Sequence, residues 1–83
     1  MIKKQFAIYD SKAEFYSDPY PYHTTGEALR AFTETANDAN SNISKHPEDF
    51  TLFEIGTYDN TSASWTPLEA KKSLGTALEY KQQ

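Results

Sequence analysis

The side chains best suited to coordinate a metal or contact a partner lie close together in residues 45–49. This stretch places a lysine, a histidine and two acids around a proline, and His23 with Asp18 forms a second group of potential metal ligands. Zinc sites use three or four ligands at regular spacings, and neither group follows such a pattern. We therefore expect no metal site, and interpret the stretch as a polar surface for a protein partner. Its contact residues would be Lys45, His46, Glu48 and Asp49.

Motifs for catalysis and for nucleotide binding do not occur in the sequence. Serine and histidine are present, but no serine lies in the Gly-x-Ser-x-Gly pattern of a nucleophile elbow. The glycines at 26, 56 and 75 are too far apart to form a phosphate-binding loop. We expect a protein that is not an enzyme and that uses no cofactor.

A second candidate chemistry is the stacking of aromatic rings on nucleic-acid bases. The sequence holds 5 Phe, 6 Tyr and 1 Trp, which makes twelve aromatic residues in 83. Proteins that hold single-stranded DNA combine such rings with basic side chains. The competing interpretation is that the rings mainly pack in the core. The candidate DNA-binding residues are Lys3, Lys4, Tyr9, Arg30, Tyr58, Trp65, Lys71 and Lys72.

The charge balance weakens the case for nucleic-acid binding. Eight basic and twelve acidic residues give a net charge of −4, whereas proteins that bind mainly by neutralising phosphates are basic. The charge is unevenly distributed, however. Residues 1–9 carry +2, residues 10–59 carry 3 basic and 10 acidic groups (−7), and residues 60–83 carry 3 basic and 2 acidic groups (+1). The lysines near the two termini would form one basic patch if the fold brings them together.

The N-terminal part of the chain predicts a β-hairpin that would position Tyr9. Residues 5–10 alternate in polarity, with Phe6 and Ile8 on one face of the predicted strand and Tyr9 on the other. Turn-forming residues follow, and the chain returns as a second strand over residues 13–16.

A stiff connector and one helix follow this hairpin. Two prolines in residues 18–23 predict an extended path that is neither helix nor central strand. Thr24 and Glu27 match a capping box, in which each side chain accepts from the other residue's backbone amide. The helix is predicted to run from Thr24 to Asn37 and to lie across the sheet. Its apolar stripe recurs at spacings of three and four, through Ala28, Leu29, Phe32, Ala36 and Ala39.

The second half of the chain predicts another hairpin. Pro47 disfavours helical backbone at the residue before it, so any preceding helix must end there. β-Branched and aromatic residues then predict a strand over residues 50–58, followed by a turn at 59–62 and a returning strand at 63–66. Pro67 would end the ladder or lie at a sheet edge.

The predicted fold class is α+β, in which two β-hairpins form an antiparallel sheet packed under one α-helix in the order β-β-α-β-β. Residues 69–72 are predicted to start a short helical turn. The C-terminal tail is predicted to be extended, an edge strand or a short helix, and Gly75 argues against the helix.

The length of the chain predicts a single domain over residues 1–83. A domain of this size buries about 60 to 65% of its unfolded surface, so its core is marginal and homo-oligomerisation remains open. The sequence contains no cysteine, and it shows no apolar run of the length of a membrane span or signal peptide. We therefore expect no association with membranes.

Several blocks of the sequence, in order along nearly the whole chain, resemble the small nonstructural protein of gokushoviruses, which are single-stranded DNA phages of the Microviridae. Residues 17–23 do not match this pattern. The matching blocks are Tyr9-Asp10-Ser11-Lys12-Ala13, Gly26-Glu27-Ala28-Leu29-Arg30-Ala31-Phe32, Asn37-Asp38, residues 45–53, Gly56 with Tyr58-Asp59, and Leu74-Gly75-Thr76-Ala77-Leu78.

The resemblance implies a non-virion protein of the host bacterial cytoplasm. It would be the counterpart of the microvirus protein that switches DNA synthesis toward single strands and directs their packaging. Its partners would then be viral replication or procapsid proteins, and the family supplies no catalytic residues. Two alternatives stay open: direct binding of single-stranded DNA by an aromatic sheet face with terminal lysines, and a structural role as an assembly dimer. Salt dependence would separate DNA contacts from a protein docking site.

Overall fold

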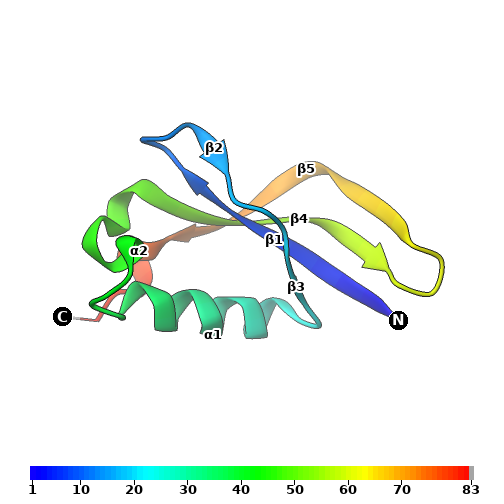
Figure 1. Cartoon of the computed structure of the whole chain (residues 1–83), viewed down its shortest axis with the longest axis horizontal. Coiled ribbons are helices and arrows are strands. Elements are labelled where there is room, and N and C mark those ends of the chain that lie inside the picture. Colours follow the sequence, from blue (N-terminus) through cyan, green and yellow to red (C-terminus); the bar gives the residue numbers. More distant parts are fainter. Residues whose placement is uncertain (83) are drawn as a thin grey trace.

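One antiparallel sheet is backed on one side by a single long helix (Figure 1). The computed structural model describes residues 1–82. This arrangement confirms the predicted α+β class. The elements are β1 (Ile2–Asp10), β2 (Phe15–Tyr16), β3 (Tyr20–Tyr22), α1 (Thr25–Ala36), α2 (Asn42–Lys45), the 3-10 turn η1 (Pro47–Asp49), β4 (Phe50–Asp59), β5 (Ser64–Thr76) and α3 (Ala77–Tyr80).

Strands β1 and β4 form the centre of the sheet, in the order β2-β1-β4-β5. β3 also pairs with β1, so β2 and β3 form one interrupted edge strand. Ser17 bridges the interruption, because its amide donates to the Ile8 carbonyl (2.8 Å) and its Oγ accepts from the Ile8 amide (2.9 Å). The proline-rich segment predicted as a connector therefore contains a short strand. Pro21 is tolerated there because β3 lies at the sheet edge.

Strand β5 differs most from its prediction. It continues through Pro67, which lies at a sheet edge, the second of its two predicted positions. It also includes residues 69–72, which are strand and not the expected helical turn. Glu54 and Gly56 of β4 are two residues apart, whereas their partners Lys72 and Pro67 are five apart. The extra residues of β5 therefore arch away from the ladder, on the side of the sheet opposite α1 (Figure 1).

The close approach of β5 to β4 explains the glycine at position 56. A Cβ atom on Gly56 would lie 2.5 Å from the Thr66 carbonyl oxygen and 3.0 Å from the Pro67 Cα. Both neighbours are backbone atoms, so neither can move aside by a side-chain rotation. Gly56 thus lets the arch begin directly over β4.

Helix α1 is fixed by its first residues and by its apolar stripe. The predicted capping box is present, with Glu27 N donating to Thr24 Oγ1 and Thr24 N donating to Glu27 Oε1, both at 3.1 Å. The helix proper is one residue shorter at each end than predicted, because Thr24 and Asn37 are its caps. Its buried face contributes to the core of the domain. The core residues are Phe6, Ala28, Phe32, Ala36, Leu52 and Ala77.

The remaining short helices pack at one end of α1. α2 was not predicted, and it ends at Lys45, before Pro47, as expected from the proline. Two of the predicted alternatives for the C-terminal tail each hold for part of it. Residues 74–76 end the edge strand β5, and residues 77–80 form the short helix α3. Its Tyr80 ring packs edge-on against Phe32, with ring centroids 6.0 Å apart. None of the helices in residues 1–82 is long and apolar enough to cross a membrane.

Candidate nucleic-acid interface

The sheet has one face covered by α1 and one face that we call the open face. Cross-strand partners lie on the same face, and successive residues alternate between faces. Phe6 and Ile8 belong to the helix-covered face, where they pack in or against the core. Tyr9 therefore lies on the open face, as the predicted alternation requires.

The first cluster of the open face joins three rings from three strands. Tyr16 of β2 pairs with Tyr9 of β1, and their ring centroids are 4.8 Å apart. Phe53 of β4 meets Tyr16 edge-on at 5.6 Å. The Lys71 ammonium, from the arch of β5, lies 5.8 Å from the centroid of the Tyr16 ring. Because Tyr16 remains 42% exposed, the cluster presents an aromatic surface beside a positive charge.

The second cluster lies toward the other end of the open face. Tyr58 of β4 pairs with Lys3 of β1 on one side and with Trp65 of β5 on the other. Tyr58 and Trp65 are 36% and 44% exposed. An open pocket of about 470 Å³ lies beside them, and its lining residues are Lys3, Gln5, Pro19, Pro21, Tyr58, Asn60 and Trp65.

Of the five basic residues predicted to contact DNA, the fold brings only Lys3 and Lys71 to the open face. Lys72 pairs with Glu54, so it belongs to the opposite face. Lys4 also belongs there, and its Nζ donates to Thr25 Oγ1 at the start of α1 (3.2 Å).

Arg30 completes the set of predicted basic residues, and it lies apart from the open face. It is exposed on α1, in the layer that covers the other side of the sheet. The candidate interface is therefore narrower than the predicted set. Its members are Lys3, Tyr9, Tyr58, Trp65 and Lys71, with Tyr16 and Phe53 added.

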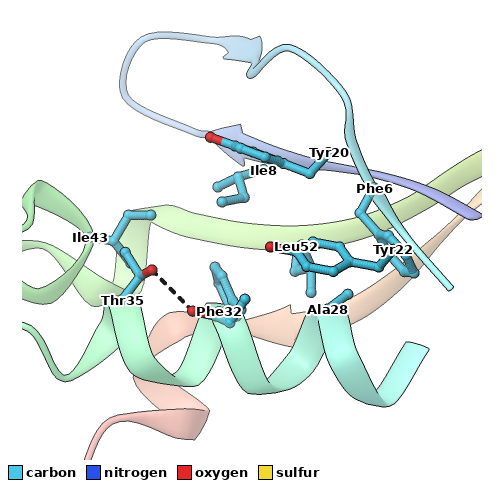
Figure 2. Close-up of a pocket in the computed structure, with 10 residues that line it drawn as sticks. Phe6, Ile8, Tyr20, Tyr22, Ala28, Phe32, Thr35, Ile43 and Leu52 are labelled. Carbon is cyan, nitrogen blue, oxygen red and sulfur yellow. Dashed lines mark hydrogen bonds between the residues drawn. The ribbon is translucent and has the colours of Figure 1, made fainter. Parts of the chain in front are cut away.

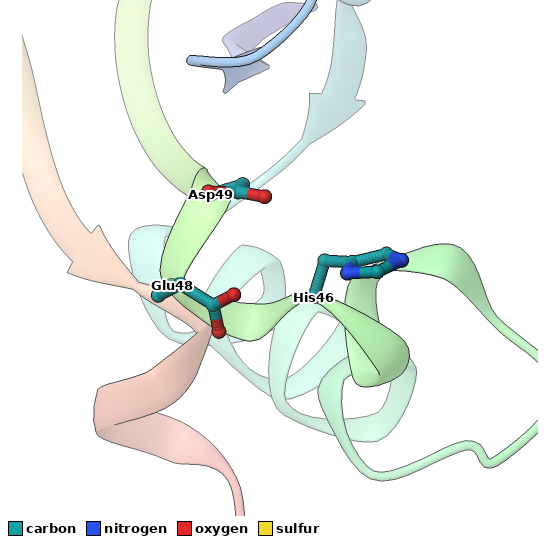
Figure 3. A group of neighbouring side chains, drawn as sticks. All are labelled: His46, Glu48 and Asp49. Atoms are coloured by element: carbon teal, nitrogen blue, oxygen red, sulfur yellow. The ribbon is translucent and has the colours of Figure 1, made fainter.

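The polar stretch at residues 45–49 forms a separate surface on α2 and η1. Ligand atoms of His46, Glu48 and Asp49 all lie within 4.8 Å of one another (Figure 3). The turn is tied to the first hairpin, because the Ser11 amide donates to the Asp49 carbonyl at 2.9 Å. Lys45 is exposed at the end of α2. His46, Glu48 and Asp49 are thus brought together as predicted, on turns that lie outside the strands of the open face.

A third feature is an apolar pocket of about 120 Å³ between α1, the sheet and β3 (Figure 2). Its walls include core residues such as Phe6, Phe32 and Leu52. Among the described residues, Thr35 is the only hydroxyl residue that α1 contributes to this pocket. Its hydroxyl already donates to the Ala31 carbonyl within the helix, at 3.0 Å. The pocket belongs to the packing layer beneath the helix.

Comparison with known proteins assigns the chain to a phage family. The family model described as Phage ORF5 protein matches residues 3–80. The chain belongs to this family.

The ORF5 family assignment agrees with a match to one curated phage protein. The chain is 32% identical over 69 residues to Protein ORF5 of Chlamydia phage 1, covering 78% of this chain and 72% of that protein. No solved structure matches the chain. These findings confirm that it is a phage protein of the Microviridae type that the sequence blocks resemble.

Four residues that line the pocket of the second cluster were not predicted from the sequence: Gln5, Pro19, Pro21 and Asn60. Alternation along β1 places Gln5 on the same face as Tyr9, so its side of the sheet was predictable. Pro21 and Asn60 reach the pocket only through the pairing of β3 and the turn after β4, which the local sequence does not specify.

Proposed function

We propose that this ORF5 protein is a non-enzymatic binding protein that holds viral single-stranded DNA on its open face. By doing so it directs single-stranded DNA synthesis and genome packaging in the bacterial cytoplasm, together with viral replication or procapsid proteins. The observation that carries the proposal is the pairing of two exposed aromatic clusters with one lysine each, on the sheet face that α1 leaves uncovered.

The open face has the composition expected of a stacking platform. Stacking of a base on an aromatic side chain contributes about 1–3 kcal/mol per base and tolerates any base. Tyr16 and Trp65 each present more than two fifths of their surface, at 42% and 44%. Lys71 of β5 lies over the Tyr16 ring, and Lys3 of β1 lines the same pocket as Trp65. A strand of unpaired nucleotides lying along this face would place bases on the rings and phosphates near the ammonium groups.

The net charge of −4 limits how the protein can hold DNA. Each phosphate neutralised on single-stranded DNA contributes about −0.7 to the slope of log affinity against log salt. Two lysines therefore give a slope of about −1.4, which is small for a DNA-binding protein. Most of the affinity would then come from stacking, and double-stranded DNA, whose bases are already stacked, would bind weakly.

The polar surface at residues 45–49 supports a second contact, with a protein. It presents both signs of charge on exposed side chains, from Lys45 and Glu48. It lies on the α2 and η1 turns, whereas the DNA surface lies on the sheet. A replication or procapsid protein could therefore dock there without displacing the DNA.

Replacing one exposed ring on each face of the sheet tests DNA binding. Trp65→Ala should weaken binding of a labelled single-stranded oligonucleotide about 5- to 150-fold, the equivalent of one stacked base. Phe15→Ala is the matched control, because Phe15 is also an exposed ring, at 64%, but lies on the other face. It pairs with Asp10, and alternation along β1 puts Asp10 on the helix-covered face. Equal affinities of the Trp65 variant and the wild type would refute the proposed surface.

The role in the phage requires a separate measurement in infected cells. A phage that carries Trp65→Ala should accumulate double-stranded replicative DNA normally and yield fewer single-stranded genomes in particles. The Phe15→Ala phage should resemble the wild type. Normal single-stranded synthesis and packaging in the Trp65→Ala phage, for a variant shown to have lost DNA binding in vitro, would contradict the proposed role.

A further inference from the structure

We infer that the pocket beside Trp65 is a base-recognition site in which the Gln5 side chain hydrogen-bonds to the edge of one unpaired adenine. The inference rests on the proposed function, and it goes beyond it by adding base selectivity to a surface that stacking alone would leave tolerant of any base. It starts from Gln5 in the middle of β1, a polar side chain that is largely buried and forms no side-chain hydrogen bond within the described residues.

Gln5 is a largely buried polar side chain that has no hydrogen-bond partner in the described part of the chain. It is 7% exposed, and it lies on the open face between its cross-strand partners Gly56 and Pro21. No side-chain hydrogen bond of Gln5 occurs among residues 1–82, whereas the adjacent Lys4 donates from Nζ to Thr25 Oγ1. Most buried side-chain polar groups are paired within the protein, so the Gln5 carboxamide depends on solvent or a ligand for its hydrogen bonds.

The Gln5 side chain is accessible from the pocket. No side-chain nitrogen or oxygen in residues 1–82 is both fully enclosed and unpaired, so the Gln5 carboxamide retains access to solvent. Gln5 is one of the residues that line the pocket, so the pocket gives its accessible carboxamide a path to solvent. A ligand that enters the pocket can therefore take up the hydrogen bonds that the protein leaves open.

The other walls suit a planar base with its phosphate. Tyr58 and Trp65 supply rings, and Pro19 and Pro21 supply flat apolar surface from the opposite edge. A volume of about 470 Å³ lies within the range of small-molecule sites, roughly 300–1,000 Å³. Lys3 also lines the pocket and is the only cationic side chain of the described residues that does so.

Asn60 is the remaining polar side chain of the pocket, and it is already engaged. Its Oδ1 accepts a hydrogen bond from the Met1 ammonium group at 2.9 Å. The Gln5 carboxamide has no such partner in the described residues, so its amide N–H groups and its carbonyl oxygen are both free. This pair complements adenine, whose N6 amino group donates and whose N7 accepts.

The test compares wild-type protein and Gln5→Leu in binding to single-stranded oligo(dA) and oligo(dT) of equal length. The wild type should prefer oligo(dA) by about 5- to 150-fold, the value of one bidentate base contact. Gln5→Leu should lose this preference and bind the two oligonucleotides about equally. The variant retains the size and burial of the side chain, so its unfolding temperature checks that the sheet is intact.

A second measurement uses the unmodified protein, and it decides the matter if Gln5→Leu fails to fold. The side-chain amide resonances of Gln5 in an NMR spectrum should shift on addition of oligo(dA), and shift much less with oligo(dT). Equal binding of both oligonucleotides, or a dA preference that persists in Gln5→Leu, would overturn the base-recognition site and leave the stacking surface standing. Absence of binding to either oligonucleotide would refute the proposed function and this inference together.

Discussion

Two adjacent lysines, Lys71 and Lys72, allow the electrostatic part of the proposed interface to be measured at constant net charge. Lys71 lies over the Tyr16 ring on the open face, at 5.8 Å from its centroid. Lys72 pairs with Glu54, whose side chain accepts from Thr25 at the start of α1, so it belongs to the other face. Lys71→Ala and Lys72→Ala each remove one positive charge from the protein. Only Lys71→Ala removes that charge from the proposed DNA-binding face.

The size of the effect follows from counterion release. With Lys3 and Lys71 each neutralising one phosphate, a slope of about −1.4 means that affinity falls about sevenfold when salt rises from 50 to 200 mM. Lys71→Ala leaves one contact and a slope of about −0.7, so the same change in salt lowers affinity only about threefold. Lys72→Ala should keep the wild-type slope.

Fluorescence anisotropy of a labelled single-stranded oligonucleotide, titrated with each variant at several salt concentrations, gives these slopes directly. A slope reduced in Lys71→Ala and unchanged in Lys72→Ala supports the assignment of the open face. Equal slopes for the two variants would refute it, because the loss would then reflect overall charge and not position.

Three further predictions concern the stability of the scaffold. Gly56→Ala should lower the free energy of unfolding by about 1–3 kcal/mol, because the new Cβ would lie 2.5 Å from the Thr66 oxygen. Gly26→Ala is its control and should be neutral or stabilising in thermal unfolding, since its nearest neighbour is 3.8 Å away. Thr24→Ala should cost about 0.5–2 kcal/mol through loss of the α1 cap, seen as a lower denaturant midpoint with an unchanged slope. A backbone hydrogen bond in the β4–β5 turn lowers the pKa of Asp59 below 3.8, so its contribution to stability is complete above that pH and is lost as pH falls through the folded-state pKa. Carboxyl NMR titration should show this lowered pKa, and an Asp59 pKa at or above 3.8 would contradict the hydrogen-bonded turn.

Features fixed by local chemistry were predictable from the sequence. The Thr24 capping box and the stripe through Phe32 located α1 to within one residue at each end, since both signals depend on residues three or four apart. Alternation in β1 correctly separated Phe6 from Tyr9. Pro47 correctly placed the end of the preceding helix, because its ring restricts the backbone of its neighbour.

Features that depend on strand pairing were not predictable. Residues 68–72 contain Leu, Glu, Ala and two lysines, which favour helix, but pairing with β4 holds them in β5. The arch within β5 places Lys71 over Tyr16 and Lys72 on the other face. The local sequence does not specify how many residues the arch contains. The pocket at Gln5 is lined by residues of β1, β3, β4 and β5, which come together only when the sheet has folded.

The most direct test of the central claim compares the binding of single-stranded and double-stranded oligonucleotides of the same sequence. Fluorescence anisotropy at about 50 mM salt should give saturable binding of the single strand, at least about tenfold tighter than of the duplex, because only unpaired bases can stack on the open face. Equal or tighter binding of the duplex, or no binding of the single strand at about 100 μM protein, would contradict a function in holding single-stranded DNA.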